Sequence, residues 1–195
     1  ASLALGVGGV VVGQEGSFDE GRPVEGLDQR YEDWSPSLTE DGLMLYFSSS
    51  RPAGRPHDIW VATRLGRDDP FGEPIPVAEL NTGFGEYNPN ISRDGRAIYF
   101  DSYRPGGRGY SDIYVATRDD RGQPFGTPQN LRGVNTAAEE WDASLSADGK
   151  LYFGRSSAAD VDLYVATWSA EDQAFGNVQP LTGINTAFGE GSPSV

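Results

Sequence analysis

Hydrophobic and polar positions alternate along this chain in three nearly identical short stretches. Residues 58–63 read DIWVAT, residues 112–117 read DIYVAT and residues 162–167 read DLYVAT. Each stretch is rich in aromatic and β-branched residues and is bounded by polar residues, which is typical of a β-strand. A catalytic motif normally occurs once, whereas a structural unit recurs. The pattern therefore predicts a repeat fold.

An aromatic anchor sets the period of the repeat. The segment WSPSL at residues 34–38 aligns with segments that begin at Tyr87, Trp141 and Gly191. The spacing of about 50 residues matches the length of a four-stranded propeller blade. Three units are complete, and the fourth contains only its first segment.

Each unit follows the same course after its anchor. An Asp-Gly pair at residues 41–42, 94–95 or 148–149 stands between two apolar runs, which is a strong hairpin signal. The DIWVAT-type strand follows after a loop, and a last strand follows a Phe-Gly pair. Four strands in each unit and no convincing helix predict an all-β fold, a β-propeller built from four-stranded blades.

These repeats resemble the WD-like repeats of the TolB-type β-propeller family. The matching text is SPSLTEDGLMLYFSS…DIWVATR, with the copies NPNISRDGRAIYFDS…DIYVATR and ASLSADGKLYFGR…DLYVATW. The resemblance covers residues 18–195 and implies the propeller fold. Such repeats occur in periplasmic and outer-envelope binding proteins, and as the non-catalytic domain beside some peptidases. The resemblance therefore implies a binding role outside the cytoplasm.

Both ends of the chain bear on the number of blades. Residues 18–30 resemble a fourth strand that runs into an anchor, so about four blades are expected, the last one closed by both termini. A part of a larger propeller is the alternative. Residues 1–17 form an apolar segment that is uncharged through Gly13, and a bilayer needs roughly 20 such residues. This segment is either a closing strand or the remnant of a signal peptide or membrane anchor.

Charge and composition exclude several classes of function. The net charge is −14, with 29 acidic and 15 basic residues, which disfavours binding to nucleic acid and to anionic lipid. The chain has no cysteine and a single histidine, so disulfides, thiolate metal sites and multi-histidine metal sites are excluded. Serine-nucleophile, phosphate-loop and paired-histidine motifs are also absent from the sequence. No catalytic residue is predicted.

An acidic residue precedes each anchor, at Asp33, Glu86, Glu140 and Glu190. Because the first strand of each blade lines the channel of a propeller, these carboxylates are expected to form an acidic ring at one mouth. Such a ring is able to hold a cation such as Ca²⁺. The alternative, which we favour, is that each carboxylate serves its own blade, since residues locked to a repeat usually serve the repeat. No other cofactor or metal is expected.

The loops between second and third strands differ from unit to unit, so the fold does not require their residues. Propellers usually bind partners through such rim loops, and Arg and Tyr suit a carboxylate-bearing ligand or a protein hot spot. The alternative is a solvated loop whose arginines pair with neighbouring acids. The predicted partner-binding residues are Arg51, Arg55, His57, Arg104, Arg108 and Tyr110.

The leading hypothesis is a non-enzymatic, protein-binding scaffold. It would be an extracytoplasmic accessory subunit docked on a larger envelope or membrane complex, with the N-terminal segment as a membrane contact. One alternative is a glycan-acting hydrolase or lyase that uses the channel carboxylates. Another is the propeller domain of a larger peptidase. The acidic ring follows the repeat, whereas an active site should break it, and this favours the binding hypothesis.

Overall fold

A computed structural model describes residues 23–25, 27, 31–51, 56–156 and 160–195 of the chain. All regular elements within these ranges are β-strands, and no helix there is long and apolar enough to cross a membrane. The strands are β1 (Asp33–Leu38), β2 (Met44–Ser49), β3 (Asp58–Thr63), β4 (Ile75–Pro76), β5 (Glu86–Ile91), β6 (Ala97–Ser102), β7 (Asp112–Thr117), β8 (Gln129–Asn130), β9 (Glu140–Leu145), β10 (Lys150–Ser156), β11 (Val161–Ser169) and β12 (Ala174–Pro180).

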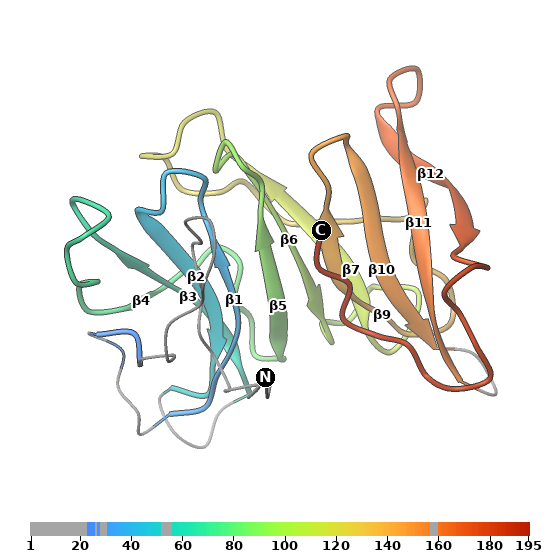
Figure 1. Cartoon of the computed structure of the whole chain (residues 1–195), viewed down its shortest axis with the longest axis horizontal. Helices are drawn as coiled ribbons and strands as arrows, with labels where there is room; N and C mark the ends of the chain where they lie inside the picture. Colours follow the sequence, from blue (N-terminus) through green and yellow to red (C-terminus); the bar gives the residue numbers. More distant parts are fainter. Residues whose placement is uncertain (1–22, 26, 28–30, 52–55, 157–159) are drawn as a thin grey trace, which may run out of the picture.

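The strands form three antiparallel sheets of four strands, each in chain order. Figure 1 shows the sheets standing side by side along the chain, as consecutive blades of a propeller do. The first strands of neighbouring blades, β1, β5 and β9, contact one another and make the inner edge. Each blade begins at a predicted anchor, so the all-β propeller prediction is confirmed.

Asp-Gly pairs close the predicted hairpins between first and second strands. Gly42, Gly95 and Gly149 adopt φ values of 74°, 71° and 80°, a region that glycine enters without steric cost. The Asp41 carboxylate accepts hydrogen bonds from the Thr39 hydroxyl at 2.7 Å and the Leu43 N–H at 3.1 Å. The turn residues therefore satisfy their own backbone, as hairpin turns of this kind usually do.

Apolar side chains between neighbouring blades form the core. One cluster joins Ile59 and Val61 of β3 to Ile98 and Phe100 of β6, and a second joins the second blade to the third in the same manner. Large apolar side chains at these seams are fully buried, which contributes about 1.5–3 kcal/mol for each one. Face-to-face packing of repeated positions thus holds the blades together.

The outer face of the third blade is only partly covered by the described residues. Ile184 is 56% exposed, although the corresponding Leu80 and Val134 of the other blades are 0% and 1% exposed. Residues 191–195 form no strand, yet Ser192 has a φ of 56° and the Val195 N–H donates to the Ser144 hydroxyl at 3.3 Å. This segment follows the course of a first strand. The predicted closing segment, residues 1–17, lies outside the described residues.

The fourth strands are shorter than the sequence predicts in two blades. β4 and β8 contain two residues each, because the chain turns away directly after them. In the first blade the Leu80 N–H donates to the Val77 carbonyl at 2.9 Å. The Leu27 N–H donates to the Val24 carbonyl in the same way, at 3.3 Å, and most of residues 18–30, the predicted fourth strand, lie outside the described residues.

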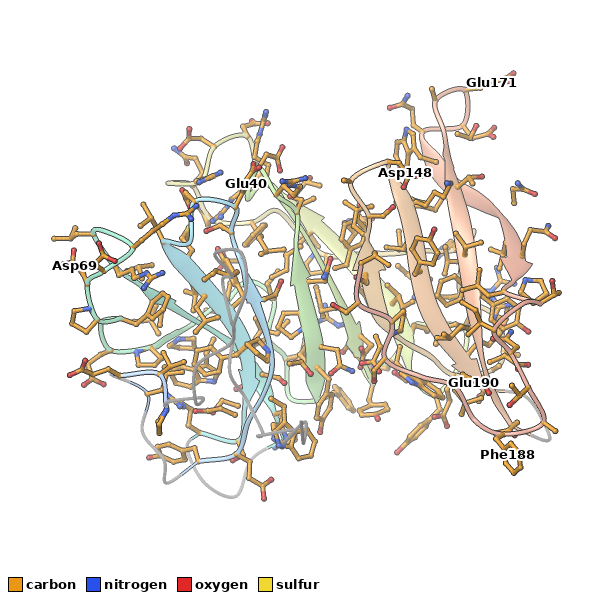
Figure 2. All side chains as sticks on the ribbon, in the orientation of Figure 1. Glu40, Asp69, Asp148, Glu171, Phe188 and Glu190 are labelled. Carbon is orange, nitrogen blue, oxygen red and sulfur yellow. The ribbon has the colours of Figure 1, made fainter. Side chains whose placement is uncertain are left out.

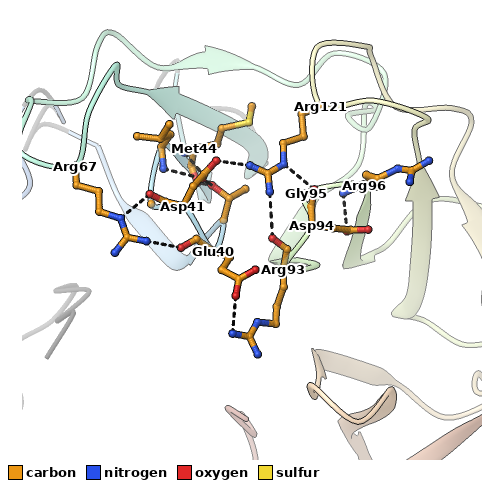
Figure 3. A network of polar contacts seen from close by, with 12 residues as sticks. Glu40, Asp41, Met44, Arg67, Arg93, Asp94, Gly95, Arg96 and Arg121 are labelled. Atoms are coloured by element: carbon orange, nitrogen blue, oxygen red, sulfur yellow. Dashed lines mark hydrogen bonds and ion pairs between the residues drawn. The ribbon is translucent and has the colours of Figure 1, made fainter.

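A polar network joins the first two blades at the end that carries the Asp-Gly turns (Figure 3). Arg121 pairs with the Asp41 carboxylate, and Arg93 pairs with Glu40 at 2.8 Å. Arg67 donates to the Asp41 and Glu40 carbonyls at 2.8 and 2.7 Å. Exposed ion pairs of this kind contribute about 0–1 kcal/mol each. The charges in this network therefore compensate one another.

Candidate functional site

The opposite end of the blades carries a continuous row of aromatic rings. Trp34, His57, Tyr87, Tyr103 and Tyr110 contact one another in this order, with ring centroids 4.8, 5.1, 5.5 and 5.0 Å apart. We term these five residues the aromatic row. The first two belong to the first blade and the others to the second, so the row crosses a blade boundary. Ring pairs contribute about 0.5–1.5 kcal/mol beyond their buried area, which holds the rings in place.

Much of the aromatic row is open to solvent. Trp34 is 49% exposed, Tyr103 37% and Tyr110 74%. Isolated exposed aromatic residues are common on soluble proteins, but contiguous exposed apolar surface marks an interaction site. The row therefore has the character of a docking surface.

Further exposed rings occur at repeat-equivalent positions elsewhere in the chain. Phe84 and Phe188 occupy equivalent positions before β5 and near the C-terminus, and both are exposed. Figure 2 shows Phe188 and Glu190 at the end of the molecule opposite Glu40 and Asp148. The aromatic surface thus belongs to the end at which the first strand of each blade begins.

A β-bulge follows each of the two anchor rings in the row. Ser35 and Asn88 have φ values of 51° and 50°, and the pairing register of both strands shifts at this point. Short polar side chains tolerate this left-handed conformation better than most residues do. The Ser35 hydroxyl donates to the Asn88 amide oxygen at 2.5 Å. This bond ties the two bulges together, so Trp34 and Tyr87, which precede them, keep a fixed spacing.

The loop that carries Tyr110 is fixed at both of its sides. Asp112 accepts hydrogen bonds from the N–H groups of Arg108 at 2.6 Å and Gly109 at 3.1 Å. Gly109 also lies so close to the Ala138 carbonyl that an added Cβ would overlap the oxygen. The loop is therefore held by its own blade and by the third blade.

Gly109→Ala is expected to displace this loop and to lower the free energy of unfolding by about 1–3 kcal/mol, because the Ala138 backbone has to move. Hydrogen exchange of residues 104–111, together with urea unfolding, would measure both effects. Gly83→Ala is the matched control, since an added Cβ there meets nothing within 4 Å. Equal exchange rates in the Gly109→Ala variant and the wild type would contradict this account of the loop.

His57 and its neighbour Asp33 keep unused hydrogen-bonding capacity beside the row. Both the His57 Nε2 atom and the Asp33 Oδ1 atom are buried without a hydrogen-bond partner. Burial lowers the pKa of His57, and the carboxylates of Glu32 and Asp33 act in the opposite direction. The histidine is therefore neutral at neutral pH. Buried polar atoms without partners are uncommon in native proteins and ask for an explanation.

The predicted acidic ring is engaged inside the blades. Glu86 is fully buried and accepts hydrogen bonds from the Thr82 N–H at 2.9 Å, the Thr82 hydroxyl at 2.6 Å and the Ser102 hydroxyl at 2.8 Å. It also pairs with Arg104 at 3.2 Å. All of these partners belong to the second blade or to the turn that leads into it, so this carboxylate serves the fold.

The other three acidic positions repeat this local pairing. No three histidine, aspartate or glutamate side chains in the described ranges come together as a metal site. The pairs are Glu140 with Thr136 and Arg155, Asp33 with Arg51, and Glu190 with Thr186.

The structure separates the predicted partner-binding residues into two groups. Arg51 is 6% exposed and lies over the rings of Phe47 and Trp60, and Arg104 pairs with Glu86. These two guanidinium groups are internal, which corrects their place on the predicted partner surface. Of the others, His57 and Tyr110 belong to the aromatic row, Arg108 is exposed beside it, and Arg55 lies outside the described residues. For this second group partner binding stays a prediction.

Comparison with known proteins identifies the architecture. No protein-family model and no curated protein matches the sequence. A solved structure of putative TolB from Agrobacterium tumefaciens is similar, with a TM-score of 0.55 and 22% identity over 79% of this chain and 50% of that chain. The chain has the TolB-type propeller fold.

Enzymes share this TolB-type fold. A puromycin-hydrolysing peptidase of Mycobacterium tuberculosis matches with a TM-score of 0.53 and 20% identity, over 80% of this chain and 22% of that chain. A thermostable family-43 glycoside hydrolase matches with a TM-score of 0.52 and 15% identity, over 85% and 59%. The chain spans between 22% and 59% of the length of these three structures. Likeness at this level shows the fold and leaves the activity open.

One pair of carboxylates breaks the repeat of the TolB-type blades. Asp101 on β6 is almost fully buried, whereas the corresponding positions are Ser48 and Gly154. Its Oδ1 atom accepts hydrogen bonds from the Asn88 amide at 3.0 Å and the Asp142 N–H at 3.2 Å. Burial, and then the charge of Asp142, raise the pKa of Asp101 to about 7. Burial raises the pKa of Asp142 as well.

Three members of the aromatic row and the Asp101–Asp142 pair were not predicted from the sequence. Trp34 and Tyr87 were interpreted only as anchors of the repeat. Tyr103 could have been recognised as a candidate site residue, because the other blades have Ser50 and Ser156 at its position. The general signal is a residue that departs from the repeat, since the fold alone does not require it.

Proposed function

We propose that this chain is a non-enzymatic binding domain of TolB-type fold that docks a partner protein on its aromatic row. The proposal rests on the contact between rings that come from four separate chain segments. Three of these rings are exposed to solvent. Tyr and Trp are enriched at the energetic centres of protein interfaces. The packed blades and the fixed bulges hold the rings rigidly, which reduces the entropy cost of binding.

The proposal includes a role as an extracytoplasmic accessory subunit of an envelope complex. The resemblance of the repeats to periplasmic TolB-type binding proteins supports this location. The net charge of −14 argues against nucleic acid as the partner. The N-terminal segment is a further proposed contact with the membrane.

Replacing Trp34 and Tyr110 together by alanine is expected to reduce partner recovery at least about tenfold, since hot-spot rings contribute about 2 kcal/mol or more each. The measurement is affinity capture of the tagged protein from gently solubilised native envelopes, with quantitative mass spectrometry. Trp168→Ala is the matched control, because this tryptophan is 48% exposed on β11, outside the row. Equal recovery of the same partner by the wild type and the double variant would rule out docking on the row.

A second candidate function is glycan hydrolysis, favoured by the Asp101–Asp142 pair. These two carboxylates depart from the repeat and lie at the seam between the second and third blades. Glycosidases use one protonated and one ionised carboxyl group, and a raised pKa suits the protonated role. A panel of chromogenic aryl glycosides tests this candidate. Turnover that disappears in both Asp101→Asn and Asp142→Asn would favour the enzyme, and absence of turnover in the wild type would dismiss it for these substrates.

A further inference from the structure

Inside the fold, several aromatic rings of this chain are covered by arginine side chains. Each of the three described blades contains a guanidinium group that lies over an aromatic ring of the same blade. The distances from the guanidinium carbon to the ring centroid are 4.2–5.5 Å. These cation–π contacts recur because a guanidinium stacks well on an aromatic face. The arginines concerned are Arg51, Arg64, Arg104, Arg118 and Arg155.

The rings of the aromatic row have no such cation. In the described part of the chain no guanidinium or ammonium group lies over any of them, although several arginines are near in sequence. Arg104, which follows Tyr103 directly, lies over Phe100 and Tyr114 instead. Among the described residues, the exposed rings therefore contact other rings of the row and no cation.

Carboxylates act on two members of the row, His57 and Tyr103. Burial, and then the charge of Asp101, raises the pKa of Tyr103, and the carboxylate of Glu139 acts in the same direction. Glu32 and Asp33 are the charged groups that act on His57. A positive charge brought to these rings would thus gain from the ring faces and from the carboxylates around them.

We propose that the aromatic row binds a basic segment of the partner, with arginine side chains seated over the exposed rings of Trp34, Tyr103 and Tyr110. This inference rests on the proposed function and names the chemistry of its partner. The charges of Glu32 and Asp33 act on His57, a member of the row, and a guanidinium carries only donors, which suits carboxylate acceptors. The net charge of −14 steers a basic segment toward the protein. A carboxylate-bearing partner was suggested by four rim arginines, of which Arg51 and Arg104 are paired with carboxylates of their own blades.

The test measures fluorescence anisotropy of labelled peptides at physiological ionic strength. The probe alternates Arg and Gly, and matched peptides carry Gln or Glu in place of Arg. The variant Trp34→Leu, Tyr103→Leu, Tyr110→Leu removes the rings and leaves the charge unchanged. We expect it to bind the Arg peptide at least about tenfold more weakly than the wild type, with Trp168→Leu unchanged. The Glu peptide should not bind.

Three results would overturn the inference. The first is that the Arg peptide shows no measurable binding. The second is that the wild type and the triple variant bind the Arg peptide equally. The third is that neutral oligosaccharides on a glycan array bind in a ring-dependent manner while the Arg peptide does not. If the triple variant fails to fold, the three single Leu variants replace it, each with an expected loss of about two- to fivefold. Ring-dependent capture of a protein without ring-dependent binding of the Arg peptide would leave the proposed function intact and remove only this inference.

Discussion

Asp101→Asn is expected to raise the free energy of unfolding by about 1–3 kcal/mol at about pH 8 and to leave it nearly unchanged at about pH 4. At the higher pH the wild-type carboxylate is ionised while almost fully buried beside Asp142, which is unfavourable. Asparagine is neutral and keeps the Oδ1 acceptor for the Asn88 amide and the Asp142 N–H. The gain comes from removing a charge without losing these hydrogen bonds.

The sign follows from the two pKa values of Asp101. The ordinary pKa of 3.8 applies to the unfolded chain, and burial raises the value to about 7 in the folded protein. Between these values the folded protein binds more protons than the unfolded chain does. The stabilising contribution of the protonated carboxyl is therefore complete below about pH 4 and is lost as the pH rises to about 7. Urea unfolding at a series of pH values measures this slope, which Asp101→Asn should remove.

Two further variants serve as controls for the pH dependence. Hydrogen bonds from the Lys150 ammonium, and next from the Ser146 hydroxyl, lower the pKa of Asp148 to about 2. Asp148→Asn should therefore change the slope of stability against pH in the sense opposite to Asp101→Asn, and below the ordinary carboxyl pKa. Asp142→Asn removes a charge that raises the pKa of Asp101 and should shift the slope toward lower pH. If the difference in free energy of unfolding between Asp101→Asn and the wild type does not grow between about pH 4 and pH 7, the buried-carboxylate account is contradicted.

The fold was predictable because its determinants are local. The Asp-Gly turns and the alternation of apolar positions repeat three times, so each copy confirms the others. The shortness of β4 and β8 was not predictable, because it depends on a backbone turn after Ile75–Pro76 and after Gln129–Asn130. Closure of the ring by both termini stays a prediction, since it depends on contacts between segments distant in sequence.

The candidate site was only partly predictable, because its contacts join distant segments. The rim loops named His57 and Tyr110, but spacing in the sequence does not reveal that Tyr87 and Tyr103 join them into one row of rings. Sequence also does not show the direction of a long side chain. Arg51 and Arg104 belong to loops that differ among the blades, yet their guanidinium groups reach back to carboxylates inside the blades.

The buried Glu86–Arg104 pair should be the most sensitive point of the second blade. Glu86→Gln is expected to lower the free energy of unfolding by about 3 kcal/mol, because it leaves the charge of Arg104 buried without a counter-ion. Glu140→Gln should have a similar effect, since Glu140 pairs with Arg155 in the same way in the third blade. Urea unfolding at neutral pH, with a circular dichroism signal, measures both variants.

Glu190→Gln is the matched control for these two variants. Glu190 occupies the same repeat position and bonds Thr186, but it pairs with no arginine in the described part of the chain. Its replacement should change the free energy of unfolding by less than about 1 kcal/mol. The double variant Glu86→Gln, Arg104→Met should recover part of the loss, because it removes the unpaired charge as well. Equally small changes in the free energy of unfolding at Glu86, Glu140 and Glu190 would show that the carboxylate–arginine pairs do not stabilise the blades. The carboxylates would then again be candidates for a functional ring.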